Sequence, residues 1–136
     1  MEKQKRSCLI VLLLVVLTVS CMMFRQRLAV ENAVQRLKQI RQAQVKHLEL
    51  ETVYGNLEDL HMAHLLADEL ADGHDQGYFF TIVKSADGYI ASATPDGSDP
   101  DEIGTSFFLD QTGVIRASFV RSQPAGPKND PIYKQD

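Results

Sequence analysis

The feature that most constrains this chain is an apolar run near its N-terminus. Residues 8–24, CLIVLLLVVLTVSCMMF, contain no charge, no proline and no glycine, and only Thr18 and Ser20 are polar. As a helix, these 17 residues rise about 26 Å, at the short end of what is needed to cross a hydrocarbon core about 30 Å thick. The run therefore predicts a transmembrane helix, preceded by a basic tail over residues 1–7.

The run also limits what the rest of the chain can build. It holds 15 of about 60 apolar residues, which leaves about 38% apolar residues in the remaining 119. A core of that size argues against a buried catalytic cavity. Both cysteines, Cys8 and Cys21, lie inside the run, and the glycines are isolated in turns rather than grouped as a phosphate-binding loop. We therefore expect no enzyme and no small-molecule substrate.

Two other hypotheses for the run compete with an uncut anchor. A cleaved signal peptide would fit the basic start, but no small-x-small cleavage site follows the run. A lipoprotein signal would place the lipid on Cys21, because the segment 17–21, LTVSC, resembles a lipobox. The sequence that follows favours an uncut signal-anchor.

A second helix pattern begins directly after the run. Residues 25–52 contain no proline or glycine, and their apolar residues recur at intervals near 3.6. These residues are Val30, Ala33, Val34, Leu37, Ile40, Ala43 and Leu48. They predict an amphipathic helix over 25–52 that continues the membrane helix without a break, in the simplest case as a plain anchor with a stalk.

Charge is distributed unevenly along the chain. Residues 58–110 carry 12 acidic residues and the single base Lys84, so we expect no nucleic-acid binding. Basic residues lie on both sides of the apolar run, so their count does not decide its orientation. We expect a cytoplasmic N-terminus, because the short tail would otherwise have to be translocated. The basic residues after the run form either a solvated helix face or a contact with anionic headgroups.

The second half of the chain predicts a small α+β domain over residues 53–121. Asn56 is expected to cap a helix that Gly73 ends, with an apolar face formed by Leu57, Leu60, Ala63, Ala67 and Leu70. The period then becomes strand-like, and turn residues lie at 87–88 and 110–113. The expected strands cover 78–83, 89–94, 105–109 and 114–120, with Ile115, Ala117 and Phe119 sharing one face.

Together these elements predict three or four antiparallel strands in a meander, with one face packed on the long helix. The tail over 122–136, with Pro124, Pro127 and Pro131, lacks periodicity and is expected to be disordered.

Several stretches resemble the type IV pilin and pseudopilin family of bacteria. They are ENAVQRLKQIRQAQ on the long helix, VYGNLEDL after it, GYFFTIV and GYIASATP in the first hairpin, and GTSFFLDQTGVIRAS in the last. The final stretch is the most specific of them, and the resemblance covers roughly residues 25–120. It implies a pilin-like fold on the bacterial inner membrane, with the domain periplasmic or extracellular. It also implies a structural or assembly role in a type IV pilus or type II secretion-like system, beside other pilin-like or secretion-system proteins.

The chain departs from the family's pattern around the apolar run. Processed family members have a glycine before the run, cut by a prepilin peptidase, and a glutamate five residues into the mature chain. Here the first glycine is Gly55 and the first acid after the run is Glu31. The prepilin peptidase site is therefore missing, and we expect an uncut protein that is monomeric or associated with an assembly.

Two groups of residues could hold a metal. His61 and His64, with Asp68 and Asp72 further along the expected helix, could bind zinc, but short pairs of this kind often arise by chance and a solvated helix face is the preferred explanation.

The loop at 95–102 offers hard oxygen ligands of the kind that calcium takes. The candidate ligands are Asp96, Ser98, Asp99, Asp101 and Glu102, on a loop that Gly97 lets turn sharply. The spacing does not match an EF-hand, but some pseudopilins hold calcium in the sheet region, so the resemblance supports this site. The alternative is a solvated acidic turn.

The leading hypothesis is thus a membrane-anchored, pilin-like structural or assembly protein. The alternative from another class is a lipid-anchored periplasmic binding module, attached through Cys21 and unrelated to filaments. A third hypothesis is a small cytoplasmic domain on a single-pass anchor.

Overall fold

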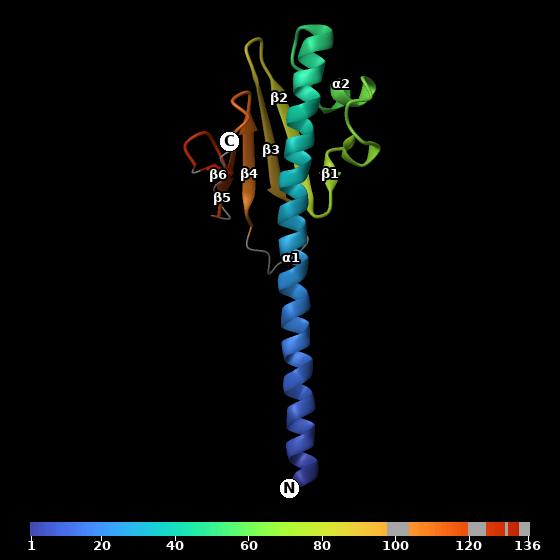
Figure 1. Ribbon diagram of the computed structural model, residues 1–136, viewed down its shortest axis with the longest axis vertical. Coiled ribbons are helices and arrows are strands. Elements are labelled where there is room, and N and C mark those ends of the chain that lie inside the picture. Colours follow the sequence, from blue (N-terminus) through green and yellow to red (C-terminus); the bar gives the residue numbers. More distant parts are fainter. Residues whose placement is uncertain (98–103, 120–124, 130, 134–136) are drawn as a thin grey trace.

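The computed structural model describes residues 1–97, 104–119, 125–129 and 131–133. It has one long N-terminal helix, whose first half projects alone and whose second half lies against an antiparallel sheet (Figure 1). The fold class is therefore α+β with a helix packed on a sheet, as expected from the sequence.

The long helix, α1, runs without interruption from Glu2 to Glu51. Its 50 residues correspond to a length of about 75 Å. It ends at Thr52, which adopts the left-handed conformation (φ 62°) and donates its backbone N–H to the carbonyl of Leu48. The prediction that the apolar run and the amphipathic segment form one continuous helix is confirmed.

The second helix is much shorter than predicted. Helix α2 spans Leu57–Met62 and begins with the expected Asn56 cap, which forms a reciprocal capping box with Asp59. It ends in a Schellman motif, in which His64 (φ 57°) donates to the carbonyl of His61 and Leu65 donates to that of Leu60. A helix reaching to Gly73 was thus wrong, because a non-glycine residue takes the left-handed position that stops it.

The chain then returns to the sheet through a single turn of 3₁₀ helix. This turn, η1, spans Asp68–Leu70 and buries Leu70. Gly73 (φ 76°) follows it, and an added Cβ there would lie 2.8 Å from the carbonyl oxygen of Phe80. Gly73 therefore allows close approach to the sheet rather than ending a helix.

The sheet is an antiparallel meander whose spatial order follows the sequence. Its strands are β1 (His74–Asp75), β2 (Tyr78–Lys84), β3 (Tyr89–Pro95), β4 (Ser106–Asp110), β5 (Ile115–Ser118) and β6 (Pro131–Tyr133). The four predicted strands correspond to β2 to β5, and both predicted turns join them. At the second turn Gly113 (φ 78°) donates its N–H to the carbonyl of Asp110.

The two edges of the sheet differ from the prediction. Neither β1 nor β6 was expected, and β6 forms within the tail predicted to be disordered, because residues 131–133 pair with β5. The remainder of that tail beyond 125–129 lies outside the described residues. Phe119 was expected to share the buried face of Ile115 and Ala117, but it follows the end of β5 and is exposed.

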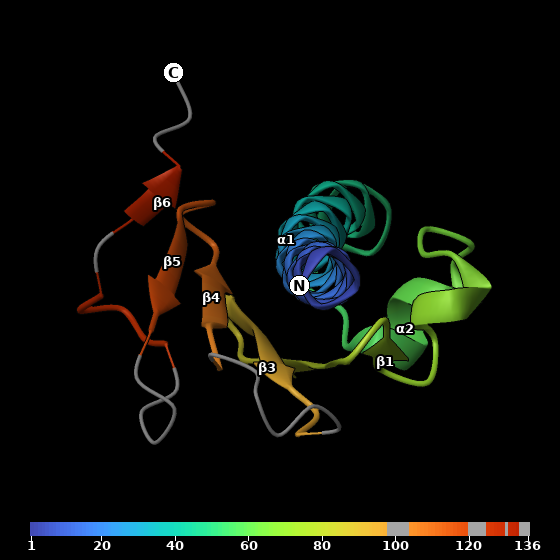
Figure 2. The same ribbon diagram turned by 90° about the horizontal axis from the view of Figure 1, so that it is seen from below.

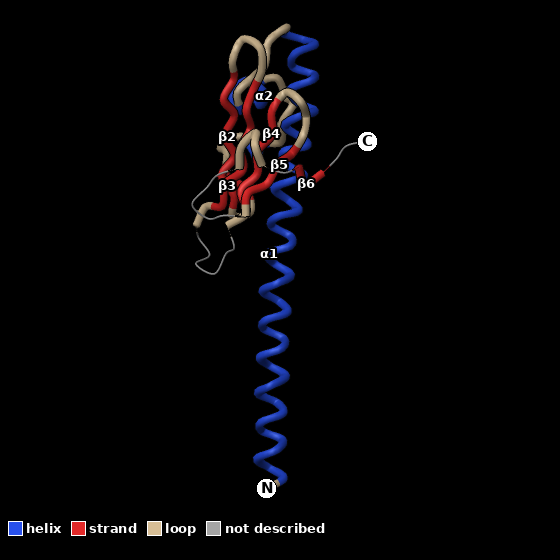
Figure 3. The backbone as a smooth tube through the Cα atoms, turned by 90° about the vertical axis from the view of Figure 1, so that its left-hand side faces the viewer, coloured by secondary structure: helices blue, strands red, loops and turns tan. Residues whose placement is uncertain are grey.

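The core lies between α1 and the concave face of the sheet (Figure 2). Viewed from the side, the sheet covers only one side of α1, and only its C-terminal half (Figure 3). Leu37 and Ile40 of α1 are fully buried against the sheet. The same core cluster includes Tyr78, Phe80, Ala91, Ala93, Phe107, Leu109, Ile115 and Ala117 of the sheet. The small alanines at the centre of β3 leave room for α1 to approach closely.

Candidate functional site

The first half of α1 presents its whole apolar run to the surroundings. The large apolar side chains from Leu9 to Phe24 are 49% to 67% exposed. The helix has a mean hydropathy of 2.8 over its most apolar window, and none of that window is buried in the protein. By length and composition it is one helix able to cross a membrane. An exposed apolar surface around an entire helix is compatible with a single-pass anchor.

The domain begins within two turns of the end of this run. Ala29 and Val30 are the first α1 residues that pack against the core. One turn later, Asn32 Nδ2 and Arg36 Nε both donate to Asp75 Oδ2 on β1, at 3.0 Å and 2.6 Å. The base of the domain therefore lies about 8–12 Å beyond Phe24 along the helix.

Asp75 is ion-paired where α1 meets the sheet edge. Its partial burial would by itself raise the pKa, but the hydrogen bonds from Asn32 and Arg36 outweigh that effect and hold the pKa of Asp75 below 3.8. The side chains of Arg36 and Asp75 are only 16% and 12% exposed, so solvent screens this pair less than a surface ion pair.

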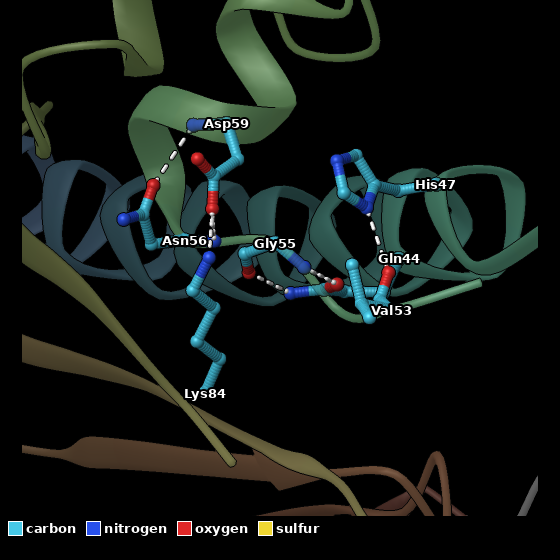
Figure 4. A network of polar contacts seen from close by, with 7 residues as sticks. All are labelled: Gln44, His47, Val53, Gly55, Asn56, Asp59 and Lys84. Atoms are coloured by element: carbon cyan, nitrogen blue, oxygen red, sulfur yellow. Dashed lines mark hydrogen bonds and ion pairs between the residues drawn. The ribbon is translucent and has the colours of Figure 1, made fainter. Parts of the chain in front are cut away.

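The opposite end of the domain is fastened to α1 by a polar network (Figure 4). Gln44 is fully buried, and its amide makes two hydrogen bonds to one residue: Nε2 donates to the carbonyl of Gly55 (2.6 Å), and Oε1 accepts the N–H of Gly55 (3.0 Å). One turn on, His47 Nδ1 lies 2.8 Å from the carbonyl oxygen of Val53. Since a carbonyl can only accept, Nδ1 carries the proton in this contact. These bonds hold the chain reversal after α1.

Asp59 connects this reversal to the sheet. Its Oδ2 accepts the backbone N–H of Asn56 and a charge-assisted bond from Lys84 Nζ on β2 (Figure 4). The bond from Lys84, followed by that from Asn56, holds the pKa of Asp59 below 3.8. Lys84, the single base between residues 58 and 110, thus joins β2 to α2.

Tyr89 is a buried titratable group that packs beside Tyr54, in the segment that follows α1. Its ring lies 5.2 Å from that of Tyr54, between centroids. Burial raises the pKa of Tyr89 to about 12, and the charge of Arg41 partly opposes that rise. The phenol is therefore a neutral core group at physiological pH.

One feature of the sequence marks this network in advance. Gln44 and His47 lie on the apolar side of α1, in positions that the 3.6-residue pattern assigns to the core. Leu48, which was expected there, is 37% exposed, whereas His47 is 6% exposed. A polar side chain inside an apolar stripe indicates a buried hydrogen-bond partner.

The proposed zinc ligands do not share one helix, although two of them, His61 and Asp68, lie within ion-pair distance. His61 is in the last turn of α2, His64 lies beyond its end, and Asp68 is in η1. His61 Nδ1 lies 3.8 Å from Asp68 Oδ1. Within the described parts of the chain, no group of three histidines, cysteines or acids is placed to hold a metal. The continuous helix on which the zinc hypothesis depended does not exist.

Of the expected calcium ligands, only Asp96 belongs to the described residues; Ser98, Asp99, Asp101 and Glu102 lie outside them. Asp96 Oδ2 lies 2.8 Å from His74 Nε2, and the Asp96 N–H donates to the carbonyl of Gly77. Gly97 adopts the expected left-handed conformation (φ 76°). His74 thus pairs with Asp96, a partner that the sequence did not indicate.

The candidate lipidation site lies within the unbroken helix. Cys21 and Cys8 are both free thiols, exposed on the apolar half of α1.

Comparisons with known proteins add no relative to this description. No family model, no characterised protein and no solved structure matches the chain. The class of protein is therefore defined by its own features: an α+β domain carried on a helix whose exposed half is long and apolar enough to span a membrane.

Proposed function

We propose that this chain is a single-pass, membrane-anchored, pilin-like structural or assembly protein without catalytic activity. It would serve a type IV pilus or a type II secretion-like system in the bacterial inner membrane. Its domain would be periplasmic or extracellular, and its partners would be other pilin-like or secretion-system proteins. The observation that carries the proposal is the continuity of α1: one helix offers an exposed apolar half to a membrane and a buried half to the sheet.

Three features support the pilin-like part of the proposal. The first is the order of elements, a long N-terminal helix followed by an antiparallel meander on one side of it. The second is the length of α1, which holds the domain at a fixed position beside the membrane. The third is that polar contacts hold the domain against α1 at both ends of the domain. Arg36 bonds to Asp75 at one end, and Gln44 bonds to Gly55 at the other. Such a domain would transmit its position to the helix as one rigid unit.

The N-terminus of the mature protein tests the anchor. Intact mass and N-terminal sequencing of protein taken from membranes should find Met1, or the residue after it if the initiator is removed. A chain that begins at a lipid-modified Cys21 would contradict this and support the lipid-anchored binding module instead. Cys21→Ser is the matched variant: it should leave the mass and the N-terminus of the membrane protein otherwise unchanged if α1 is an uncut anchor, whereas a lipoprotein would lose both the lipid and the cleavage before residue 21.

Topology and assembly need separate measurements. Protease added to spheroplasts should degrade the domain, and full protection would support a cytoplasmic domain on a single-pass anchor. Filament or secretion-system membership would be tested by site-specific crosslinking from α1 in cells, with the crosslinked partners identified by mass spectrometry. Recovery of pilin-like or secretion-system proteins is the expected result, and their absence would contradict the assembly role.

A further inference from the structure

The face of the sheet turned away from α1 is half open. In β2 and β3 the side chains that alternate with the buried ones are Phe79, Thr81, Val83, Ile90, Ser92 and Thr94, which we call the open sheet face. Three cross-strand pairs make up this face, because Phe79 pairs with Thr94, Thr81 with Ser92 and Val83 with Ile90. None of these six side chains can carry a charge.

The absence of charge is unusual for a solvated sheet face in this chain. Residues 58–110 include 12 acids and one base, yet none of the 13 falls on the open sheet face. Val83, Phe79 and Ile90 are 66%, 48% and 44% exposed. Antiparallel sheets that face water ordinarily alternate apolar residues with polar or charged ones, and charges on outer strands prevent association.

The other half of the same face is covered by the chain itself. Phe108 points outward from β4 but is only 5% exposed. The segment 125–129 lies against it: Ala125 N–H donates to Ser106 Oγ, and Arg116 donates to the carbonyl of Asn129. The fold thus buries the outward face at Phe108, whereas Val83, Phe79 and Ile90 of the uncharged β2–β3 half stay exposed.

Polar groups border the open sheet face on two sides. On one side, the His74–Asp96 pair borders Phe79, whose ring centroid lies 5.0 Å from that of His74. On the other, Asp110 pairs across the strands with Ile90. An uncharged centre with a polar rim is the anatomy of a protein–protein interface.

We propose that the open sheet face binds the same face of a second copy of this chain, giving a two-fold dimer whose axis lies along the membrane normal. The proposal rests on the membrane anchor proposed above, which points both copies in the same direction. Because the strands run alongside α1 (Figure 1), rotation about this axis leaves each residue at the same distance from the membrane in both copies. It sets β2 of one copy against β3 of the other. Val83 then meets Ile90 of the second copy and Phe79 meets its Thr94, which makes the face self-complementary.

A second copy fits this face better than a charged partner. An uncharged surface offers no ion pair to an acidic or basic protein, whereas it lets two acidic copies meet without burying like charges. Two-fold dimers are also the commonest oligomers. The face is small, so association in free solution is weak, but confinement to one membrane raises the effective concentration of copies.

The arrangement fixes the distance between the two helices. The two sheets pack about 10 Å apart, and each α1 lies on the far side of its own sheet, so the helix axes are roughly 30 Å apart. Copies that associate through α1 itself would bring the axes to about 8–10 Å. The distance between helices therefore separates this dimer from helix-to-helix packing.

The test uses the full chain in lipid nanodiscs, with Cys8→Ser and Cys21→Ser so that Gln42→Cys is the single label site. Gln42 lies on the solvent side of α1, away from the sheet. Spin labels there should give a distance of 30 Å or more between copies. A distance below about 20 Å, expected when helix axes are about 8–10 Å apart, would overturn the proposal while leaving the assembly role intact. Single-molecule counting that finds only monomers would also overturn it.

A charge placed on the face gives the matched comparison. Val83→Glu, or Thr81→Lys if that variant unfolds, should weaken self-association at least tenfold, because an unpaired charge would be buried against the uncharged face of the second copy. Gln42→Glu adds the same charge to α1 and should leave association unchanged. A dimer that survives both face variants would overturn the proposal. Loss of the membrane anchor would show instead as a processed N-terminus, so the two failures are distinguishable.

Discussion

The two halves of α1 share one backbone but differ in what their apolar side chains contact. In the first half, Leu13 and Leu17 are 63% and 65% exposed, and nothing in the described chain packs on them. In the second half, Leu37 and Ile40 are fully buried under the sheet. Leucine side chains are thus exposed in the first half of α1 and buried in the protein core in the second half. The first half gains stability only from a lipid environment, and the second half gains it from the domain.

The largest effect on domain stability is expected from a substitution in the buried half of α1. Leu37→Ala should lower the free energy of unfolding of the domain by about 3–4 kcal/mol, because it leaves a cavity under the sheet. Leu13→Ala, in the exposed half, should leave that free energy unchanged. Denaturant unfolding of the detergent-solubilised chain, followed by tyrosine fluorescence, measures both. Equal effects would mean that the two halves are not distinct.

A charge in the exposed half is the converse test. Leu17→Arg should cost about 2.5–3.5 kcal/mol of membrane insertion and shift protein out of the carbonate-resistant membrane fraction. Leu50→Arg is the control, since Leu50 has a similar exposure of 68% but lies at the end of α1 beyond the apolar run. If both variants remained equally in the membrane, residues 8–24 would not be the anchor.

Within the second half of α1, the buried polar network should contribute more to stability than the exposed side of the helix. Gln44→Ala removes both hydrogen bonds to Gly55 and leaves a buried N–H and carbonyl unpaired, so we expect a loss of roughly 2–3 kcal/mol. Gln42→Ala, two residues earlier on the exposed side, should change stability by less than about 0.5 kcal/mol. Thermal unfolding by circular dichroism would measure this, and equal losses would contradict the role given to Gln44.

The smallest effect concerns pH at the base of the domain. Because the pKa of Asp75 is lower in the folded chain than its ordinary value of 3.8, its ion pair stabilises the domain above pH 3.8. That stability is lost as the pH falls through the lowered pKa. Asp75→Asn should therefore reduce stability at pH 7, by about 1 kcal/mol, and flatten the acid limb of the stability curve. An unchanged acid limb would show that the Arg36–Asp75 pair contributes nothing.

The elements that could be predicted from the sequence are those with local signals. The apolar run, the 3.6-residue pattern of α1 and the turns at 87–88 and 110–113 each mark their element independently of the rest. The end of α2 could not be found this way, because His64, rather than a glycine, takes the left-handed position. The strands β1 and β6 are two and three residues long, so they depend on pairing with β2 and β5 rather than on periodicity.

The candidate sites depended still more on tertiary structure. The zinc hypothesis assumed that His61, His64 and Asp68 share one helix, but α2 ends at Met62, so His64 and Asp68 lie beyond it, although Asp68 still comes within 3.8 Å of His61. The partners that matter, such as Gly55 for Gln44 and Asp96 for His74, lie 11 and 22 residues away in the sequence. A single sequence shows that Gln44 is a polar residue on an apolar helix face, but neither for Gln44 nor for His74 does it show which group the side chain binds.

The most direct test of the account is a spin-label scan along α1 in a lipid bilayer, one cysteine at a time from residue 8 to residue 50. The predicted result is access to oxygen but not to a water-soluble relaxant over residues 8–24. From Ala29 to His47 protection should recur every 3.6 residues, with water access on the remaining side. Water access at the centre of the run, or a break in helical periodicity between residues 25 and 28, would contradict a single helix that joins membrane and domain.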